Sequence, residues 1–220
     1  MWFEQVANFF GSLVCHQLQE RTIFLDGLPL PVCARDTGIY LGIFVSIMFI
    51  TVTRRWDSDK PPELRYSLLL CLATVPMMID GVSSYLGLRE SNNFLRILTG
   101  GLFGLPIPLL LAGLQNFKIY EKNIKPTIRS WSELVLLTAI TFMFLVMVYR
   151  DILFPWRAIS VLIIGTMLYF FYWLVLTVIS FSSIIPKLYR NGAAIVLLSI
   201  ILGVMYSFNR LIICPLKNLL

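Results

Sequence analysis

Charged residues are scarce in this 220-residue sequence. They make up 14% of the chain, whereas ordinary soluble domains hold about 25%. Hydrophobic residues account for 58%, and the mean hydropathy is +0.80. This balance excludes a soluble globular domain, and it also excludes the disordered, collagenous and disulfide-scaffold classes. The sequence is that of an integral membrane protein.

Familiar catalytic and transport signatures are also missing. The sequence has no Walker loop, dinucleotide fingerprint, H-E-x-x-H motif or G-x-S-x-G elbow. The last three apolar stretches hold no charged relay, which argues against an ion pump or a proton-coupled transporter. The net charge of +6 does not call for a nucleic acid partner, because basic residues that flank membrane spans face anionic head groups. The expected partners are membrane lipids.

Six apolar stretches dominate the chain. A hydrocarbon core of about 30 Å needs roughly 20 helical residues, and runs such as Leu109-Leu110-Leu111 are apolar on every face, unlike barrel strands. We therefore expect an all-α polytopic protein with a single membrane domain over residues 1–220. Pro76 should bend the second span, and Pro106 and Pro108 should kink the third. The spans are expected near residues 37–55, 66–87, 95–117, 132–149, 157–182 and 192–213.

The segment 1–36 precedes the first span. Its apolar residues, including Trp2, Phe3, Val6 and Phe10, recur at helical spacing. This pattern suits either an amphipathic helix in the membrane interface or a half-buried packing helix. No basic region precedes the apolar run, so we expect a retained segment and not a signal peptide. It should fold over the outer ends of spans one to three.

The basic residues indicate an orientation. Six spans place both termini on one face of the membrane, here called the terminal face. Ten lysines and arginines fall on the opposite face and eight on the terminal face. The excess favours a cytoplasmic position for the opposite face and extracytoplasmic termini, in a cell or inner membrane. Seven of the eight terminal-face residues are arginines, whose planar fork suits carboxylate or phosphate.

The first polar constellation lies in the segment before span one. Two thiols, the only histidine and a carboxylate fall within 22 residues. Such ligands could hold a divalent metal, zinc most readily. Two alternatives remain open, a disulfide between the cysteines and a pair of buried free thiols. The predicted metal ligands are Cys15, His16, Cys33 and Asp36.

The second constellation lies at the outer ends of spans two and three. Asp80 is the one charged residue in its span, and an ionisable group inside a membrane is costly enough to suggest a function. Its expected partners are Arg35, Arg89 and Arg96. The alternative is an Asp–Arg pair that only locks helices together. The predicted ligand-binding residues are Arg21, Arg35, Arg89, Ser91, Asn92 and Arg96.

These motifs together resemble a known family. Cys15-His16-Gln17, the run from Pro31 to Tyr40, Asp80-Gly81 and Leu88-Arg89-Glu90-Ser91-Asn92 are similar to the signature of a prokaryotic multi-pass membrane family, domain of unknown function 2085. The resemblance implies a zinc set of one histidine and three cysteines, with Asp36 here in place of one cysteine. Ser83-Ser84 replaces a threonine-glutamine pair. The resemblance implies no activity.

Two functions follow from these observations. In the first, the arginines line an interfacial pocket that binds or processes an anionic, lipid-borne group, and Asp36 or Asp80 would act as a catalytic base if a reaction occurs. In the second, the protein is an accessory or assembly subunit of a larger membrane complex, with a structural polar cluster. A thiol-redox role would rest on Cys15 and Cys33 alone.

Overall fold

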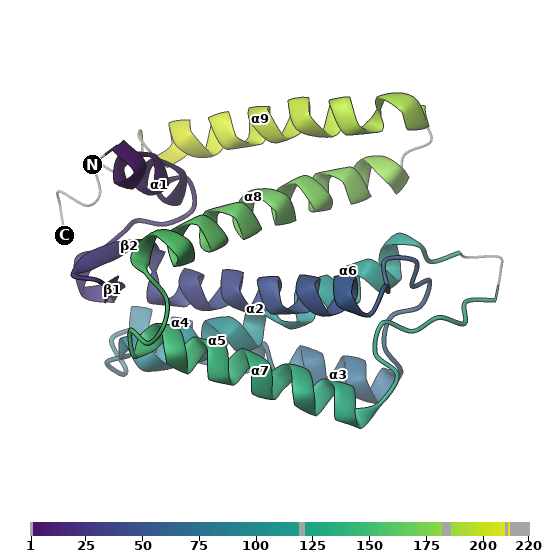
Figure 1. The fold of residues 1–220 in the computed structure, drawn as a ribbon, viewed down its shortest axis with the longest axis horizontal. Helices are drawn as coiled ribbons and strands as arrows, with labels where there is room; N and C mark the ends of the chain where they lie inside the picture. Colours follow the sequence, from purple (N-terminus) through teal and green to yellow (C-terminus); the bar gives the residue numbers. More distant parts are fainter. Residues whose placement is uncertain (1, 119–121, 182–185, 210, 212–220) are drawn as a thin grey trace.

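The computed structural model describes residues 2–118, 122–181, 186–209 and 211 (Figure 1). The N-terminal segment holds a helix, a 3₁₀ turn and two short strands, and all the remaining elements are helical. The elements are α1 (Trp2–Ser12), η1 (Gln19–Arg21), β1 (Thr22–Leu25), β2 (Leu28–Cys33), α2 (Ala34–Val52), α3 (Leu64–Leu72), α4 (Val75–Tyr85), α5 (Asn93–Gly104), α6 (Pro106–Gln115), α7 (Trp131–Tyr149), α8 (Trp156–Phe181), η2 (Lys187–Tyr189) and α9 (Arg190–Phe208).

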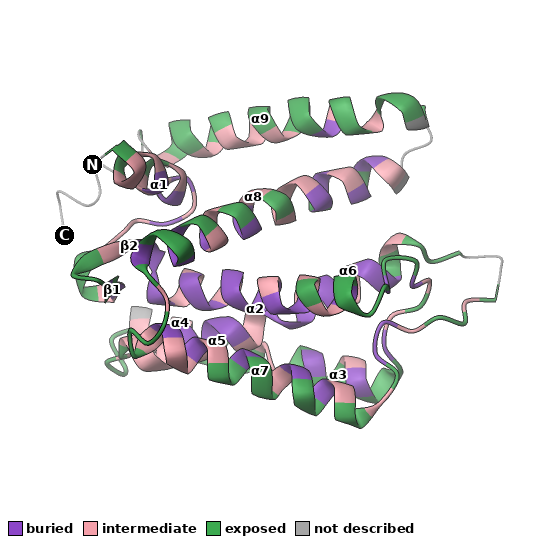
Figure 2. Cartoon of the chain, in the orientation of Figure 1, coloured by how far each residue is buried: buried purple, intermediate pink, exposed green. Residues whose placement is uncertain are grey.

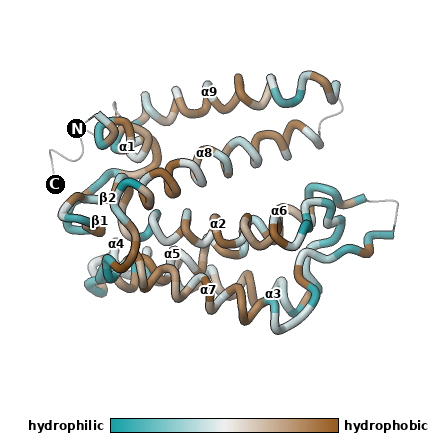
Figure 3. The backbone as a smooth tube through the Cα atoms, in the orientation of Figure 1, coloured by the Kyte–Doolittle hydropathy of each residue, from teal (hydrophilic) through white to brown (hydrophobic). Residues whose placement is uncertain are grey.

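Six helical segments are long and apolar enough to cross a membrane, which confirms the predicted class. They are α2, α3 with α4, α5 with α6, α7, α8 and α9. Residues 210, 212 and 213 of the expected last span lie outside the described residues. Hydrophilic positions gather at the two ends of the bundle and apolar positions fill its middle (Figure 3). This is the pattern of a bundle with its long axis across a bilayer.

Spans two and three are interrupted, as their prolines suggested. Helix α3 ends at Leu72, and Pro76 lies in the first turn of α4. Helix α6 begins at Pro106, directly after Leu105. Proline suits a first helical turn, where its missing N–H would have no helical partner. At the second break, the Ser46 hydroxyl donates to the Leu105 carbonyl oxygen at 2.6 Å.

Helices α2 and α5 pack backbone against backbone through glycines. A Cβ built on Gly38 would overlap the Ile97 carbonyl oxygen, and one on Gly100 would overlap that of Arg35. Gly42 and Gly104 meet facing backbone atoms in the same way. The spacing is the small-xxx-small pattern of close helix pairs in membranes. This crossing fixes the N-terminal ends of α2 and α5 next to each other, and both polar constellations lie there.

A β-hairpin stands outside the all-helical expectation. Strands β1 and β2 pair antiparallel, with Leu25 opposite Leu28. The turn residues Asp26 and Gly27 have φ values of 51° and 74°, which suit a two-residue hairpin turn. The Asp26 carboxylate accepts the Trp156 backbone N–H at 2.7 Å, and the Trp156 indole donates to the Pro29 carbonyl at 2.8 Å. The hairpin is thereby tied to the first turn of α8.

Helix α1 is half buried. It packs on β2 and α8, and the Phe3 ring meets the Trp156 ring edge-on at a centroid distance of 5.8 Å. Ala7 and Gly11 are buried, while Trp2 and Phe9 are exposed. Helix α1 is thus packed on the bundle by one side and leaves aromatic residues on its outer side, and its position in the membrane interface stays a prediction.

Burial differs strongly between the spans. Helix α2 lies at the centre of the bundle, and half of its described positions are buried (Figure 2). Helix α9 packs on α8, and Ala194 is its one buried residue among those described. The outer faces of α9 and of α3 with α4 are apolar and exposed, and they are available to lipid or to another protein.

A buried ion pair lies at the opposite face. Both terminal nitrogens of Arg55 donate to the Glu133 carboxylate, at 2.8 and 2.6 Å. Arg55 also donates to the Thr127 carbonyl at 2.8 Å. The sequence suggested only an orientation signal for Arg55. Its side chain, 7% exposed, instead joins the end of α2 to the start of α7.

Candidate functional site

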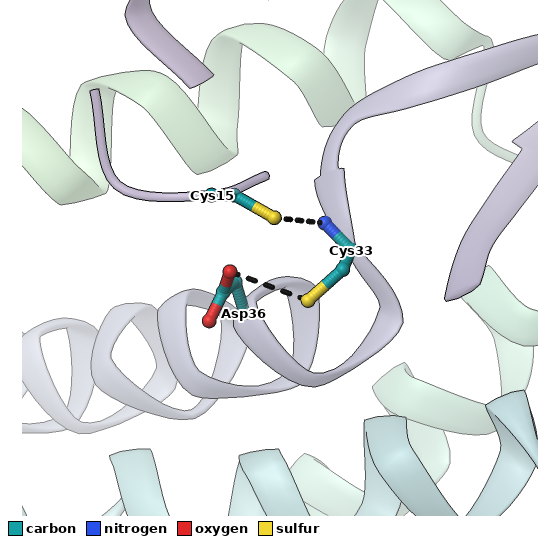
Figure 4. A group of neighbouring side chains, drawn as sticks. All are labelled: Cys15, Cys33 and Asp36. Atoms are coloured by element: carbon teal, nitrogen blue, oxygen red, sulfur yellow. Dashed lines mark hydrogen bonds between the residues drawn. The ribbon is translucent and has the colours of Figure 1, made fainter. Parts of the chain in front are cut away.

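The first constellation forms a buried cluster, here called the thiol cluster, of Cys15, Cys33 and Asp36 (Figure 4). Cys15 follows α1, Cys33 ends β2, and Asp36 lies in the first turn of α2. Their ligand atoms lie within 4.8 Å of one another. The three residues meet because β2, the second strand of the hairpin, runs directly into the first turn of α2.

Hydrogen bonds hold the thiol cluster. The Cys15 sulfur accepts the backbone N–H groups of Cys33 at 3.1 Å and of Gln17 at 3.4 Å. The Cys33 thiol donates to Asp36 Oδ2 at 3.3 Å. The hydrogen bond with Cys33 and burial raise the pKa of the Cys15 thiol, and the nearby carboxylate of Asp36 raises it further. A raised pKa favours the protonated thiol, so a metal that bound here would displace the proton of Cys15.

Three of the four predicted metal ligands form the thiol cluster, and the fourth, His16, lies beside it. Its Nδ1 lies 3.9 Å from the Cys15 sulfur, but His16 is outside the group of ligand atoms that meet in the described chain. His16 therefore lies beside the cluster next to Cys15, and its role as a fourth ligand stays a prediction. Two sulfurs and one carboxylate still fit zinc, since three protein ligands with one open position are a common arrangement. Both cysteines are free thiols, so the disulfide alternative does not describe this structure.

The second constellation is built around Asp80 of α4. Its Oδ2 accepts Arg35 Nη2 at 2.7 Å, and its Oδ1 accepts Arg89 Nη2 at 2.7 Å and the Ser91 hydroxyl at 2.6 Å. Asp80 is 2% exposed. Three donors thus hold both carboxylate oxygens of a buried group. This geometry suits an anchoring carboxylate better than a general base, whose oxygen must be open to substrate.

Arg96 completes the set near the start of α5. Its Nη1 donates to Asn93 Oδ1 at 2.9 Å, and it interacts electrostatically with Arg21, Arg35 and Asp80. Arg21 lies 3.4 Å from the carboxylate of Glu20. We name Arg21, Arg35, Arg89 and Arg96 the arginine cluster. Two of the four, Arg35 and Arg89, pair with the buried carboxylate of Asp80, and Arg21 pairs with Glu20.

Asn92 has a local structural task. Its side-chain oxygen accepts the Leu95 backbone N–H at 2.8 Å and caps α5. An N-terminal asparagine cap satisfies a backbone donor that has no helical partner. A ligand-binding role for Asn92 stays a prediction.

Two polar residues near the site were not among the predicted site residues. Gln17 Nε2 donates to the carbonyls of Asn8 and Pro31, both at 2.8 Å. Asn93 Nδ2 donates to the carbonyls of Glu20 and Thr22, both at 3.2 Å. These amides fasten the N-terminal segment to itself and to α5. Gln17 stands within the Cys-His-Gln motif, which was the available signal.

The fold and the two constellations define a polytopic helical membrane protein with a buried polar region at one end of its bundle. Residues 15–110 match the family described as predicted membrane protein (DUF2085). An uncharacterized protein of Methanocaldococcus jannaschii is 37% identical over 111 residues, covering 50% of this chain and 69% of the relative. Another, of Methanothermobacter thermautotrophicus, is 34% identical over 111 residues, covering 49% and 92%.

The chain belongs to this family of predicted membrane proteins. The match spans both constellations, from Cys15 to beyond Arg96, and ends within span three. No solved structure matches the chain. The family is of unknown function.

Proposed function

We propose that this protein binds an anionic, lipid-borne group through the arginine cluster. The observation that carries the proposal is an imbalance of charge. Arg35 and Arg89 contact the buried carboxylate of Asp80, and Arg96 interacts electrostatically with Asp80 and with the guanidinium groups of Arg21 and Arg35. An anion would relieve the mutual repulsion of Arg21, Arg35 and Arg96.

The donors suit phosphate or carboxylate. A guanidinium offers a planar fork of N–H groups that matches both oxyanions. Within the described residues, Arg35 Nε is buried and has no hydrogen-bond partner. A buried unsatisfied donor costs about 1–3 kcal/mol. An anionic oxygen at this position would remove that cost.

The position favours a ligand carried by a lipid. Arg35 lies in the first turn of α2, Arg96 near the start of α5, and Arg89 just beyond α4. The ends of membrane-spanning helices lie at head-group depth. In a hydrolytic version, Cys15, Cys33 and Asp36 would hold zinc, which could polarise a phosphoryl or carbonyl oxygen.

The test is a lipid titration of the purified full chain in a neutral detergent, read by native mass spectrometry. Phosphatidic acid is the probe, and Arg96→Gln and Arg21→Gln are compared with Arg54→Gln, an exposed arginine of the opposite face. Each terminal-face variant should weaken binding about tenfold, as for the loss of one charged contact. Arg54→Gln should bind like the parent.

A parallel titration with inorganic phosphate distinguishes the source of the anion. Competition by millimolar phosphate would identify the phosphate group itself as the ligand, whereas its failure to compete would point to the lipid as a whole. Equal phosphatidic acid affinities of the parent, Arg96→Gln and Arg21→Gln would overturn the proposal.

A second candidate is a subunit role in a larger membrane complex. It is favoured by α9, a complete span with one described buried residue, Ala194, and an exposed face that includes Ile195, Ile200 and Val204. Purification in mild detergent tests this role. A stable partner that leaves when Val204→Arg is introduced would support it, and a lone monomer would contradict it.

A further inference from the structure

We infer that the face of α8 flanked by α1 and α2 binds one phospholipid whose head group carries both a phosphate and a primary ammonium. This site is separate from the arginine cluster and goes beyond the proposed function. The inference starts from three neighbouring cavities that follow α8 from its N-terminus. We name them the mouth, the middle cavity and the lower cavity.

The mouth has a volume of about 300 Å³ and is lined by Glu4, Asp26 and Arg157, with Phe3 among its apolar walls. The middle cavity, about 240 Å³, lies between α1 and α8 and shares Phe3 with the mouth. The lower cavity, about 370 Å³, lies between α2 and α8. The middle and lower cavities share Val161 and Gly165. Together they form a polar opening followed by an apolar groove.

The mouth and the middle cavity together have the depth of one leaflet. From Arg157 in the mouth to Leu168 in the middle cavity, α8 advances 11 residues, or about 17 Å at 1.5 Å per residue, and the lower cavity continues from there to Thr51 and Trp56 at the far end of α2. One leaflet contributes about 15 Å of a hydrocarbon core of about 30 Å. The groove can therefore take an acyl or isoprenoid chain that enters at the mouth. Figure 1 shows α1 lying across the N-terminal end of α8, where the head group would sit.

The mouth has the charges for a zwitterionic head group. Arg157 supplies a cation for phosphate, and Glu4 supplies a carboxylate for an ammonium. Asp26 adds a second carboxylate, whose Oδ2 also accepts the Trp156 N–H at 2.7 Å. An anionic head group would meet two carboxylates and a single guanidinium here. A head group with both charges can satisfy all three.

Ser160 gives an independent indication of a ligand. It lines the middle cavity and is 0% exposed, and its Oγ has no hydrogen-bond partner within the described chain. Ser180 and Ser199, in contrast, donate to a carbonyl one turn back. Ser160 lies three residues beyond Arg157, about 4.5 Å deeper along the helix. At that depth a lipid has its glycerol-linked oxygens, which accept hydrogen bonds.

Gly165 offers a clean perturbation. A Cβ at Gly165 would meet nothing within 4 Å, so Gly165→Leu fills the junction of the middle and lower cavities without disturbing the backbone. The matched control is Gly203→Leu on α9, where a Cβ also meets nothing within 4 Å. Both substitutions add the same side chain to an exposed helical glycine.

The experiment titrates the detergent-purified full chain with phosphatidylethanolamine, phosphatidylglycerol and phosphatidylcholine and counts bound lipids by native mass spectrometry. We expect one phosphatidylethanolamine to bind about tenfold more tightly than either other lipid. Gly165→Leu and Glu4→Gln should each remove that preference or weaken binding about tenfold, and Ser160→Ala should weaken it several-fold. Gly203→Leu should bind like the parent.

Two results would overturn the inference. One is equal binding of the three lipids, which would leave an unselective apolar groove. The other is unchanged phosphatidylethanolamine binding in both Gly165→Leu and Glu4→Gln. Arg96→Gln, which tests the proposed function, should not alter phosphatidylethanolamine binding, so failure of one proposal is distinguishable from failure of the other.

Discussion

Replacing Asp80 by asparagine should uncouple three segments of the bundle. The carboxylate joins Arg35 of α2 to Arg89 and Ser91, which follow α4. Asparagine keeps the shape of the side chain but has only one acceptor oxygen. If that oxygen faces Arg89 and Ser91, the new amide N–H groups point at the Arg35 guanidinium, so that donor meets donor.

The magnitude follows from the burial of each partner. The Arg35 side chain is 15% exposed, so the loss of its charge-assisted bond should cost about 2 kcal/mol. The Arg89 side chain is 50% exposed, so its ion pair contributes at most about 1 kcal/mol. Asp80→Asn should therefore lower the free energy of unfolding by about 3 kcal/mol. For a chain of this size, the unfolding temperature should fall by about 6–12 °C.

Thermal unfolding in detergent, followed by tryptophan fluorescence, measures this loss. Asp57→Asn is the control, because it removes an exposed carboxylate paired with Lys125 at 2.6 Å and should change the unfolding temperature little. The double variant with Arg35→Gln should recover part of the loss, since it removes the donor left without a partner.

A second measurement connects Asp80 to the proposed function. The carboxylate competes with any anionic ligand for Arg35 and Arg89, so Asp80→Asn should bind phosphatidic acid more tightly than the parent. The reasoning is refuted if Asp80→Asn unfolds at the parental temperature and binds phosphatidic acid no better. Such a result would mean that the two arginines do not depend on this carboxylate.

Three further predictions concern packing, the opposite face and the thiols. Gly100→Ala should lower the free energy of unfolding by about 1–3 kcal/mol, the usual cost of overpacking, while Gly203→Ala should not; equal unfolding curves would contradict the close crossing of α2 and α5. Glu133→Ala should cost about 3 kcal/mol because it leaves the buried Arg55 guanidinium without its carboxylate, and normal stability would show that Arg55 finds another partner. At neutral pH, maleimide should label Cys15 far more slowly in the native protein than in SDS, because the raised pKa keeps the thiol protonated. Labelling of the native protein should become faster as the pH rises. Rapid native labelling at neutral pH, read by mass spectrometry, would contradict the buried cluster.

The spans could be predicted from the sequence because the thickness of the hydrocarbon core sets the length of each spanning helix within a few residues. The break in span three was predicted at Pro106, and α6 begins at that residue. The hairpin was missed, although Asp26-Gly27 between apolar residues is a strong local signal for a two-residue turn. The two residues of this turn are too few to change the composition of the segment 1–36.

Side-chain partners were harder to predict than helices. Asp80 was expected to meet arginines because an isolated buried charge requires a partner. The sequence could not select Arg89 over Arg96, since that choice depends on how the chain turns after α4. The ion pair of Arg55 and Glu133 joins residues 78 positions apart, and no local sequence pattern predicts such a contact. His16 lies with Cys15, as their adjacency in sequence suggested, but the sequence does not determine whether its ring also reaches Cys33 and Asp36.

The contact between Asp26 and Trp156 has a consequence for biosynthesis. It joins residues separated by 130 positions, which a ribosome adding about 5–20 residues per second covers in about 7–26 s. Throughout that interval the hairpin is complete but its docking place on the fifth span has not been made. The N-terminal segment must therefore wait on the terminal face of the membrane while four spans insert. The hairpin can therefore dock on the bundle only after the fifth span has been synthesised.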